Sequence, residues 1–334
     1  MAGQIRRGLT LDLRVERFSY HQPFRISGHV FTETALLVAT LSDGEHRGRG
    51  EGAGVYYLGD DIAHMVAEAE QVRGAIEHGA TRKELQSLLP PGGARNALDC
   101  ALWDLEAKQQ GRPVWELAGL ETPRPLRSTL TLGADSADNM AKAALAIDPE
   151  APVKVKLTGD LEEDAARVAA IRAARPDAWI GVDANQGYDI ATLARLLPVL
   201  IEAKIAQLEQ PLKRGREADL DGVARPLPFV ADESALSLCD TASLVGRFDV
   251  VNIKLDKCGG LTEGLAIARQ ARALGLDVMV GNMVGTSLSM APSYLVGQLC
   301  DIVDLDGPTF LARDRDPGVF YRSGMIHCPP EVWG

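Results

Sequence analysis

Charged side chains stand at the ends of short apolar runs throughout the second half of the sequence. In chain order they are Lys154, Lys156, Asp183, Glu209, Asp232, Lys254, Asp304 and Asp306. From Lys156 to Lys254 the successive intervals are 27, 26, 23 and 22 residues. Each interval fits one strand followed by one helix, and in a β/α barrel the carboxyl ends of the strands meet at one mouth. The spacing therefore predicts that these side chains converge on a single site.

Three of these residues, Asp183, Glu209 and Asp232, form an acidic trio on consecutive predicted strands. Their mutual repulsion would be costly unless a hard cation lay between them. Zinc would call for histidine or cysteine ligands, and these runs contain neither. A single carboxylate more often caps a helix or pairs with a surface lysine, but three acids in this register predict a Mg²⁺ site.

The lysines flank the acidic trio along the sequence. Lys154 and Lys156 point to the same face of their strand because strand side chains alternate with period two. A divalent ion bound to a carboxylate stabilises the enediolate that forms when the neighbouring α-proton leaves. A lysine beside a cation has a lowered pKa and acts as a base near neutrality. We therefore interpret Lys156 as the base and Lys154 as a ligand of the substrate carboxylate, with Lys254 approaching from the opposite side.

The elements that must position these residues are short β-branched runs separated by amphipathic helical stretches. Eight such runs occur between residues 121 and 310, namely LRSTLTLG, APVKVKLT, AWIGVDAN, IAQLEQP, PFVADES, DVVNIKL, DVMVGNM and CDIVDLDGP. Stretches such as DLEEDAARVAAIRAARP are long enough for the crossover helices that parallel strands require. The pattern predicts an α/β fold, with residues 121–310 forming a TIM-type (β/α) barrel.

Two further segments complete the predicted organisation. Residues 1–120 alternate apolar and polar positions as far as about Gly54 and then show helical periodicity from Asp60. This predicts an α+β domain that begins with an antiparallel meander. Residues 311–334 contain no barrel unit, and we expect them to pack back on the first domain.

The composition narrows the class of partner. The chain of 334 residues has a formal net charge of −11, which opposes binding to nucleic acid or to an anionic membrane, since both need clustered Lys and Arg. No apolar run approaches the roughly 20 residues of a membrane span, and the first residues lack the apolar core of a signal peptide. Five scattered cysteines without a CxxC pair argue against a disulfide framework. We expect a cytoplasmic protein that acts on a small molecule.

The sequence resembles the enolase superfamily, and within it the muconate-lactonizing-enzyme subgroup. The motifs that carry the resemblance are GRGEG (48–52), ARNALDCALWDLEAKQQGRPVWELAG, VDAN, LEQP, ADES and NIKLDKCGGLTE. The resemblance covers nearly the whole chain. It implies that the first domain caps the barrel mouth with closing loops and that the protein forms a homo-oligomer.

Histidine positions separate the subgroups of this superfamily. Members that use a His-Asp pair as base carry the histidine in the barrel. None of the six histidines here falls in the predicted barrel; they are His21, His29, His46, His64, His78 and His327. Lys156 and Lys254 are therefore expected to form the acid/base pair.

Asp304 and Asp306 favour one reaction among those that a lysine pair supports. Alternation places both carboxylates on the pocket face of the eighth strand, and DLDGP resembles the segment in which dipeptide epimerases receive the ammonium of an L-Ala-D/L-Glu type substrate. The resemblance implies an isomerase that epimerises a dipeptide α-carbon by 1,1-proton transfer through an enediolate. Arg25, in the first-domain loop, would bind a glutamyl side-chain carboxylate, while Tyr56 and Tyr57 would shape the pocket.

Alternatives stay open at this point. Asp304 or Asp306 also suits a cap of the turn that Gly307 and Pro308 form. The run GNMVGTSLSMAP is compatible with a racemase of N-acylamino acids such as N-acetyl-D-glutamate, where the Asp pair would contact an amide N–H or water. A cycloisomerase or o-succinylbenzoate synthase fits less well, because neither substrate offers the Asp pair a cation. A non-enzymatic scaffold fits least, since every acid and lysine is present.

Overall fold

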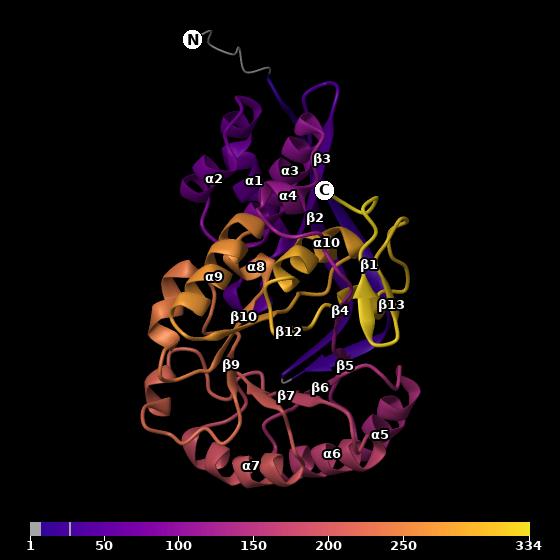
Figure 1. Ribbon diagram of the computed structural model, residues 1–334, viewed down its shortest axis with the longest axis vertical. Helices are drawn as coiled ribbons and strands as arrows, with labels where there is room; N and C mark the ends of the chain where they lie inside the picture. The colour runs from indigo at the N-terminus through magenta and orange to yellow at the C-terminus, as the bar shows by residue number, and fades with distance from the viewer. Residues whose placement is uncertain (1–7, 27) are drawn as a thin grey trace.

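Eight parallel strands form the central sheet of the computed structural model, which describes residues 8–26 and 28–334 (Figure 1). In chain order, which is also their order in the sheet, they are β5 (Leu130–Leu132), β6 (Val153–Lys156), β7 (Ile180–Asp183), β8 (Gln207–Glu209), β9 (Phe229–Ala231), β10 (Val250–Ile253), β11 (Asp277–Val280) and β12 (Ile302–Val303). Single hydrogen bonds bridge the first and last strands, including Thr129 N to Val303 O at 3.0 Å. The predicted (β/α) barrel is confirmed.

Helices connect the barrel strands on the outside of the sheet. They are α5 (Ala137–Ala146), α6 (Leu161–Ala174), α7 (Ile190–Glu202), α8 (Leu255–Cys258), α9 (Leu261–Ala273) and α10 (Ser287–Gly297). Side-chain caps start several of them. Asp160 accepts hydrogen bonds from the first-turn amides of α6, and Asp189 does the same for α7. The starting positions of these helices are therefore encoded locally.

The barrel departs from eight regular strand-helix units in two ways: some strands are followed by 3₁₀ segments, and one predicted strand is divided between two sheets. Short 3₁₀ segments follow three of the strands, namely η2 (Glu217–Leu220) after β8, η3 (Leu238–Leu244) after β9 and η4 (Gly307–Phe310) after β12. Prolines and glycines in QPLKRGREADLDGVARPLP disfavour a longer helix after β8. The run LRSTLTLG also divides into two strands, because β4 (Leu126–Arg127) pairs with β14 (Met325–His327) in a separate sheet, together with β13 (Phe320–Arg322).

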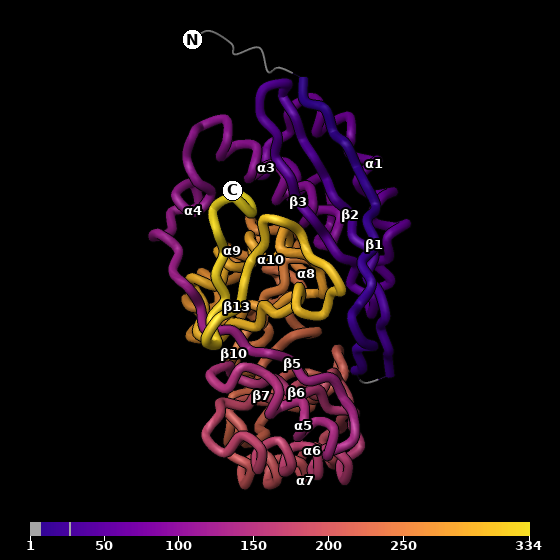
Figure 2. Tube along the Cα trace, turned by 90° about the vertical axis from the view of Figure 1, so that its right-hand side faces the viewer, coloured from indigo at the N-terminus to yellow at the C-terminus, as the bar shows by residue number. Residues whose placement is uncertain are grey.

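The first part of the chain forms the predicted antiparallel meander and helices. Its strands are β1 (Thr10–Ile26), β2 (His29–Ser42) and β3 (Arg47–Ala53), and its helical segments are η1 (Tyr56–Leu58), α1 (Ile62–Glu77), α2 (Arg82–Leu88), α3 (Gly93–Gln110) and α4 (Val114–Leu117). Figure 2 shows the long β1–β2 hairpin running down one side of the barrel. This hairpin brings first-domain residues to the barrel mouth.

The GRGEG motif lies on β3 and has a packing role. Gly48, Gly50 and Gly52 face α3, and a Cβ atom on any of them would lie 2.0 to 2.2 Å from a backbone oxygen of that helix. Only glycine permits this close approach of strand and helix. Glu51 points the other way, where its carboxylate accepts hydrogen bonds from the backbone and hydroxyl of Thr286 on the barrel side. The motif thus attaches β3 to both α3 and the barrel.

Arg95 on α3 makes several polar contacts between the first domain and the barrel. Its buried guanidinium donates to the carbonyls of Cys258 at 2.6 Å and Gly259 at 3.2 Å, and it pairs with Glu263 on α9. A further hydrogen bond reaches the carbonyl of Leu89. These contacts hold α3 against the segment that follows β10.

Replacing Arg95 with alanine is expected to destabilise the fold strongly. The change leaves the partly buried Glu263 carboxylate and several carbonyls without their donor, and breaking such a pair costs about 3–5 kcal/mol. The urea midpoint measures this loss. Arg216, whose side chain is exposed and pairs with Asp219 on the surface, provides the matched control, and its alanine variant should lose less than about 1 kcal/mol. Equal midpoints for the two variants would contradict the interpretation.

The end of the chain contacts both parts of the molecule. Besides the β13–β14–β4 sheet, Trp333 Nε1 donates to Arg49 O at 2.7 Å, and the Arg315 guanidinium pairs with Glu51. The domain boundaries at 120 and 310 stay a prediction. Over the described ranges 8–26 and 28–334, no helix combines the length and apolar character that crossing a membrane requires.

Candidate active site

The structure brings the acidic trio together at the carboxyl ends of neighbouring strands. Asp183 ends β7, Glu209 ends β8 and Asp232 follows β9, and the first two are direct partners in the strand register. All three are buried, and one oxygen from each lies within 4.8 Å of the others. Buried carboxylate oxygens at this spacing fit the oxygen-only coordination that Mg²⁺ prefers.

Two lysines neutralise the outer members of the trio. Lys156 Nζ lies 2.6 Å from Asp183 Oδ2, and Lys254 Nζ lies 2.6 Å from Asp232 Oδ2. Burial opposes ionisation of both carboxyls, but the adjacent ammonium groups outweigh it and hold the pKa of Asp183 and of Asp232 below the usual range. Glu209 behaves differently, because burial and the charge of Asp183 raise its pKa to about 7. Lys154, 2.8 Å from Glu209, opposes this rise without cancelling it.

Lys154 lies beneath the trio with its side chain almost fully buried. Its Nζ is 2.8 Å from both Asp304 and Glu209 and 3.3 Å from Asp183. Burial disfavours the ammonium, but the carboxylates around it, Asp304 first, raise the pKa of Lys154 well above its ordinary value. Its expected role as a ligand of the substrate carboxylate stays a prediction, and it would require Lys154 to exchange one of these internal partners.

Asp304 and Asp306 are both buried and both reach across to the start of β5. The hydroxyl of Thr129 donates to Asp304, and Thr131 N donates to Asp306 Oδ2 at 2.6 Å. Burial opposes ionisation of Asp304, but the charge of Lys154 outweighs burial and keeps the pKa of Asp304 below the usual range. Burial together with the charge of Asp304 raises the pKa of Asp306 to about 7. Near neutrality the second carboxyl of the pair is thus only partly ionised.

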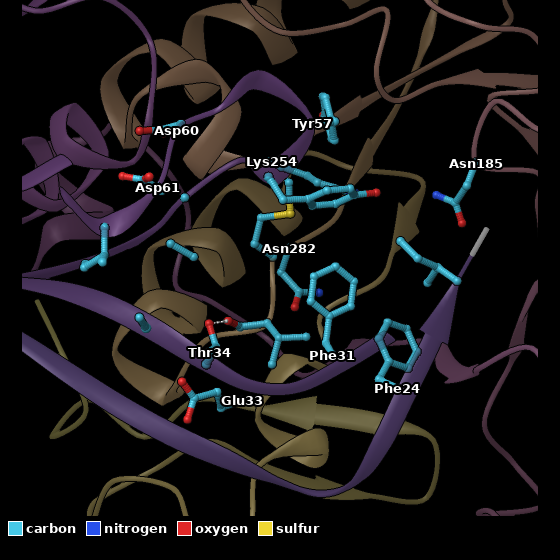
Figure 3. A pocket seen from close by; sticks show the side chains of 18 of the residues that line it. Phe24, Phe31, Glu33, Thr34, Tyr57, Asp60, Asp61, Asn185, Lys254 and Asn282 are labelled. Carbon is cyan, nitrogen blue, oxygen red and sulfur yellow. Dashed lines mark hydrogen bonds between the residues drawn. The ribbon is translucent and has the colours of Figure 1, made fainter. Parts of the chain in front are cut away.

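A cavity of about 510 Å³ reaches three of these groups, Lys156, Lys254 and Asp232, whereas Lys154, Asp183, Glu209, Asp304 and Asp306 are not among its lining residues (Figure 3). The barrel contributes Lys156, Asn185, Asp232, Glu233, Lys254, Asn282, Met283 and Val284 to its lining. The first domain contributes aromatic side chains, among them Phe24 and Phe31 from the β1–β2 hairpin and Tyr56 and Tyr57 from the loop after β3. The hairpin therefore covers the mouth, and both tyrosines line the cavity.

Arg25 does not line this cavity, although its neighbours Phe24 and Ile26 do. Its exposed side chain lines a separate hollow formed with Gly133, Ala134 and Asp135. Strand alternation explains the difference, because successive side chains on β1 point to opposite faces. Contact between Arg25 and a substrate carboxylate stays a prediction and would need the end of the hairpin to turn.

Sequence reasoning missed several polar groups of the site. Asn252 Nδ2 donates to Glu209 Oε1 at 2.9 Å, and Lys257 Nζ lies 2.6 Å from Asp232 Oδ1. Glu233 lines the cavity beside Asp232, and burial and that neighbour raise its pKa to about 8. The spacing of Lys257, three residues after Lys254 at the start of a helix, was the available signal for that residue.

Family models match both parts of the chain. The model described as mandelate racemase / muconate lactonizing enzyme, N-terminal domain, matches residues 13–119, and the enolase C-terminal domain-like model matches residues 137–329. The chain belongs to the enolase superfamily. The predicted resemblance is thereby confirmed.

Named relatives of this enolase-superfamily member are epimerases and racemases. An L-Ala-D/L-Glu epimerase of Escherichia coli is 38% identical over 95% of the chain and 99% of the relative. An N-acetyl-D-glutamate racemase of Pseudoalteromonas sp. is also 38% identical, over 90% of the chain and 95% of the relative.

Solved structures of similar proteins hold dipeptides. One from Agrobacterium tumefaciens, described as having homology to dipeptide epimerases and containing sodium and L-Ala-L-Glu, has a TM-score of 0.94 at 40% identity and covers 98% of this chain and 100% of its own. A dipeptide epimerase from Enterococcus faecalis, complexed with Mg and L-Leu-L-Tyr, has a TM-score of 0.89 at 25% identity, with 96% and 97% covered.

Proposed function

We propose that this protein is a Mg²⁺-dependent isomerase that epimerises the α-carbon of a dipeptide such as L-Ala-D/L-Glu. The observation that carries the proposal is the placement of Lys156 and Lys254. Both line one cavity; Lys156 is the last residue of β6, and Lys254 directly follows β10. These strands are four places apart in an eight-stranded barrel, so the two ammonium groups approach the cavity from opposite sides. Proton removal from one face and return to the other needs this geometry.

Different side chains have different roles in a 1,1-proton transfer. Asp183, Glu209 and Asp232 would hold Mg²⁺, which when bound supplies positive charge for the carboxylate that gains electron density as the α-proton leaves. One lysine, as the free amine, accepts the α-proton, and the other, as an ammonium, returns a proton to the opposite face. Burial opposes the charge on Lys254, but Asp232 outweighs it and raises its pKa, so the ammonium form is favoured beside Asp232. Aromatic side chains from the first domain cover the cavity.

The relatives support a dipeptide substrate, since the E. coli and A. tumefaciens proteins are named for or contain Ala-Glu dipeptides. Racemisation of an N-acylamino acid is the second candidate. It is favoured by the state of the Asp pair, because Asp304 already pairs with Lys154 and Asp306 has a raised pKa of about 7. Such a pair is less strongly anionic than a dedicated ammonium site requires. The Pseudoalteromonas racemase supports the same candidate.

The test is a deuterium-exchange screen in D₂O with Mg²⁺, comparing a library of L-Ala-L-X dipeptides with N-acetylamino acids by mass spectrometry. We expect incorporation of one deuterium at the α-carbon of the C-terminal residue, with inversion, and fastest for Glu. A matched N-acetyl library, with the same side chains and no ammonium, separates the two candidates. No exchange in either library would refute the proposal.

Replacing Asp306 with asparagine is expected to lower kcat/KM for Ala-Glu by about 10- to 100-fold, the worth of a hydrogen bond to a charged group. N-acetylglutamate, which offers no ammonium, should be little affected. In the wild type the preference for the dipeptide should grow as the pH rises through about 7, because Asp306 ionises there, and the variant should lose this pH dependence. Equal losses for both substrates would contradict an ammonium site.

We also propose that the protein acts in the cytoplasm as a homo-oligomer. All five cysteines are free, which suits a reducing compartment. Closed symmetric homo-oligomers are the commonest assemblies of soluble proteins. Light scattering coupled to size-exclusion chromatography measures the assembly state directly.

A further inference from the structure

Lys257 is a buried lysine that has no role in the proton transfer proposed above. Only 1% of its surface is exposed. Its Nζ lies 2.6 Å from Asp232 Oδ1, 2.5 Å from Asp232 O and 3.0 Å from Asn252 O. An ammonium group has three N–H donors, and here each has an acceptor. The cost of burying this charge is therefore offset by a complete set of hydrogen bonds.

The contacts of Lys257 divide the Asp232 carboxylate between two lysines. Oδ1 faces Lys257, and Oδ2 faces Lys254 at 2.6 Å. Lys254 and Lys257 belong to the same helical turn, because Lys254 is the N-cap of α8 and Lys257 N donates to Lys254 O at 2.9 Å. Lys257 donates to Oδ1 of Asp232 and also to the backbone carbonyl of the same residue. These two hydrogen bonds restrict rotation of the Asp232 carboxylate. Oδ2 is left facing Lys254, and the carboxylate keeps an oxygen within 4.8 Å of Asp183 and Glu209.

The same turn attaches the site to the first domain through a different residue. Asp256 Oδ1 accepts hydrogen bonds from Ala53 N and from Asn96 Nδ2, each at 2.8 Å. Neighbouring side chains on α8 thus have separate partners. Lys257 contacts Asp232 of the acidic trio, and Asp256 contacts β3 and α3. This separation lets substitutions distinguish a role at the acids from general support of α8.

We infer that Lys257 is a positioning residue for the reaction. It holds Asp232 so that Oδ2 serves the acidic trio and orients Lys254, the lysine on one face of the substrate. This inference rests on the proposed function. It assigns Lys257 an effect on one of the two proton-transfer faces, whereas a residue that only stabilises the fold would affect both faces alike.

The experiment uses the variants Lys257→Met and Lys257→Arg. Loss of protium in D₂O is followed separately for L-Ala-L-Glu and L-Ala-D-Glu, and the isomer whose exchange Lys254→Ala abolishes defines the Lys254 face. We expect Lys257→Met to slow exchange of that isomer roughly 10- to 100-fold more than exchange of the other, the range for residues that orient a ligand. Calorimetric titration with Mg²⁺ alone should show affinity weakened over a similar range.

The arginine variant keeps the charge and several donors, so both effects should be smaller than in Lys257→Met. Melting curves test whether each variant folds. If Lys257→Met does not fold, the exchange rates and Mg²⁺ affinity of Lys257→Arg test the inference instead. Asp256→Asn is the matched control, because it alters the same turn without touching Asp232; it should slow both isomers equally and bind Mg²⁺ as the wild type does.

Equal slowing of both isomers in Lys257→Met, or unchanged Mg²⁺ affinity, would overturn the inference. A wild-type protein that exchanges neither dipeptide would refute the proposed function instead. The two failures are therefore distinguishable in one set of measurements.

Discussion

Replacing Lys254 with alanine is expected to slow epimerisation of Ala-Glu by roughly a hundredfold to ten-thousandfold, the range that a positioned acid or base contributes. The variant removes the positioned acid/base on one face, and inversion needs proton transfer on both faces. The opposite face keeps Lys156, which lies 2.6 Å from Asp183 and lines the same cavity. Exchange of one stereoisomer with solvent deuterium should therefore survive. Lys156→Ala should show the mirror image, with the other stereoisomer still exchanging.

This stereochemical pattern distinguishes the loss of one base from general damage to the fold, because damage to the fold would slow both isomers together. Lys83, exposed on α2 and far from the barrel in sequence, provides a matched control whose alanine variant should behave as the wild type. Full exchange of both isomers by either active-site variant would rule out the assignment of Lys156 and Lys254 as acid and base.

Removal of divalent metal with EDTA is expected to abolish exchange, and Mg²⁺ should restore it. The physical reason is the convergence of three buried carboxylates, Asp183, Glu209 and Asp232, within 4.8 Å of one another. Without a cation the developing charge on the substrate carboxylate would face these acids instead of a positive centre, and repulsion would raise the barrier by several kcal/mol. Activity in EDTA, followed by stepwise return of Mg²⁺, measures the effect.

The variant Glu209→Gln tests whether the acidic trio itself binds Mg²⁺. Burial, together with the charge of Asp183, raises the pKa of Glu209 to about 7. The amide should weaken Mg²⁺ binding in a calorimetric titration without substrate, and melting curves check that the variant folds, because the amide gives up the buried ion pair with Lys154. Exchange that continues undiminished in EDTA, or Mg²⁺ affinity equal to that of the wild type, would contradict a metal site at the trio.

The convergence of the acidic trio at one mouth could be predicted because its signal is periodic, while the role of the trio as metal ligands stays a prediction. A residue at the end of each barrel strand returns at intervals of one strand-helix unit, so Asp183, Glu209 and Asp232 were recognisable from spacing alone. The same reasoning identified the mouth of the barrel as their meeting point. It overestimated regularity elsewhere, as the 3₁₀ segments after β8 and β9 and the division of LRSTLTLG between two sheets show.

By itself the sequence determined the barrel, the acidic trio and the two lysines beside it, because strand alternation and repeat length act locally. Only the tertiary structure decided which charges neutralise one another. In the structure Lys154 forms ion pairs with Asp304 and Glu209, and Lys257 forms an ion pair with Asp232. Pairing depends on burial and on distances between side chains remote in sequence, which no local pattern records. The same is true of the hairpin that covers the cavity and leaves Arg25 outside it.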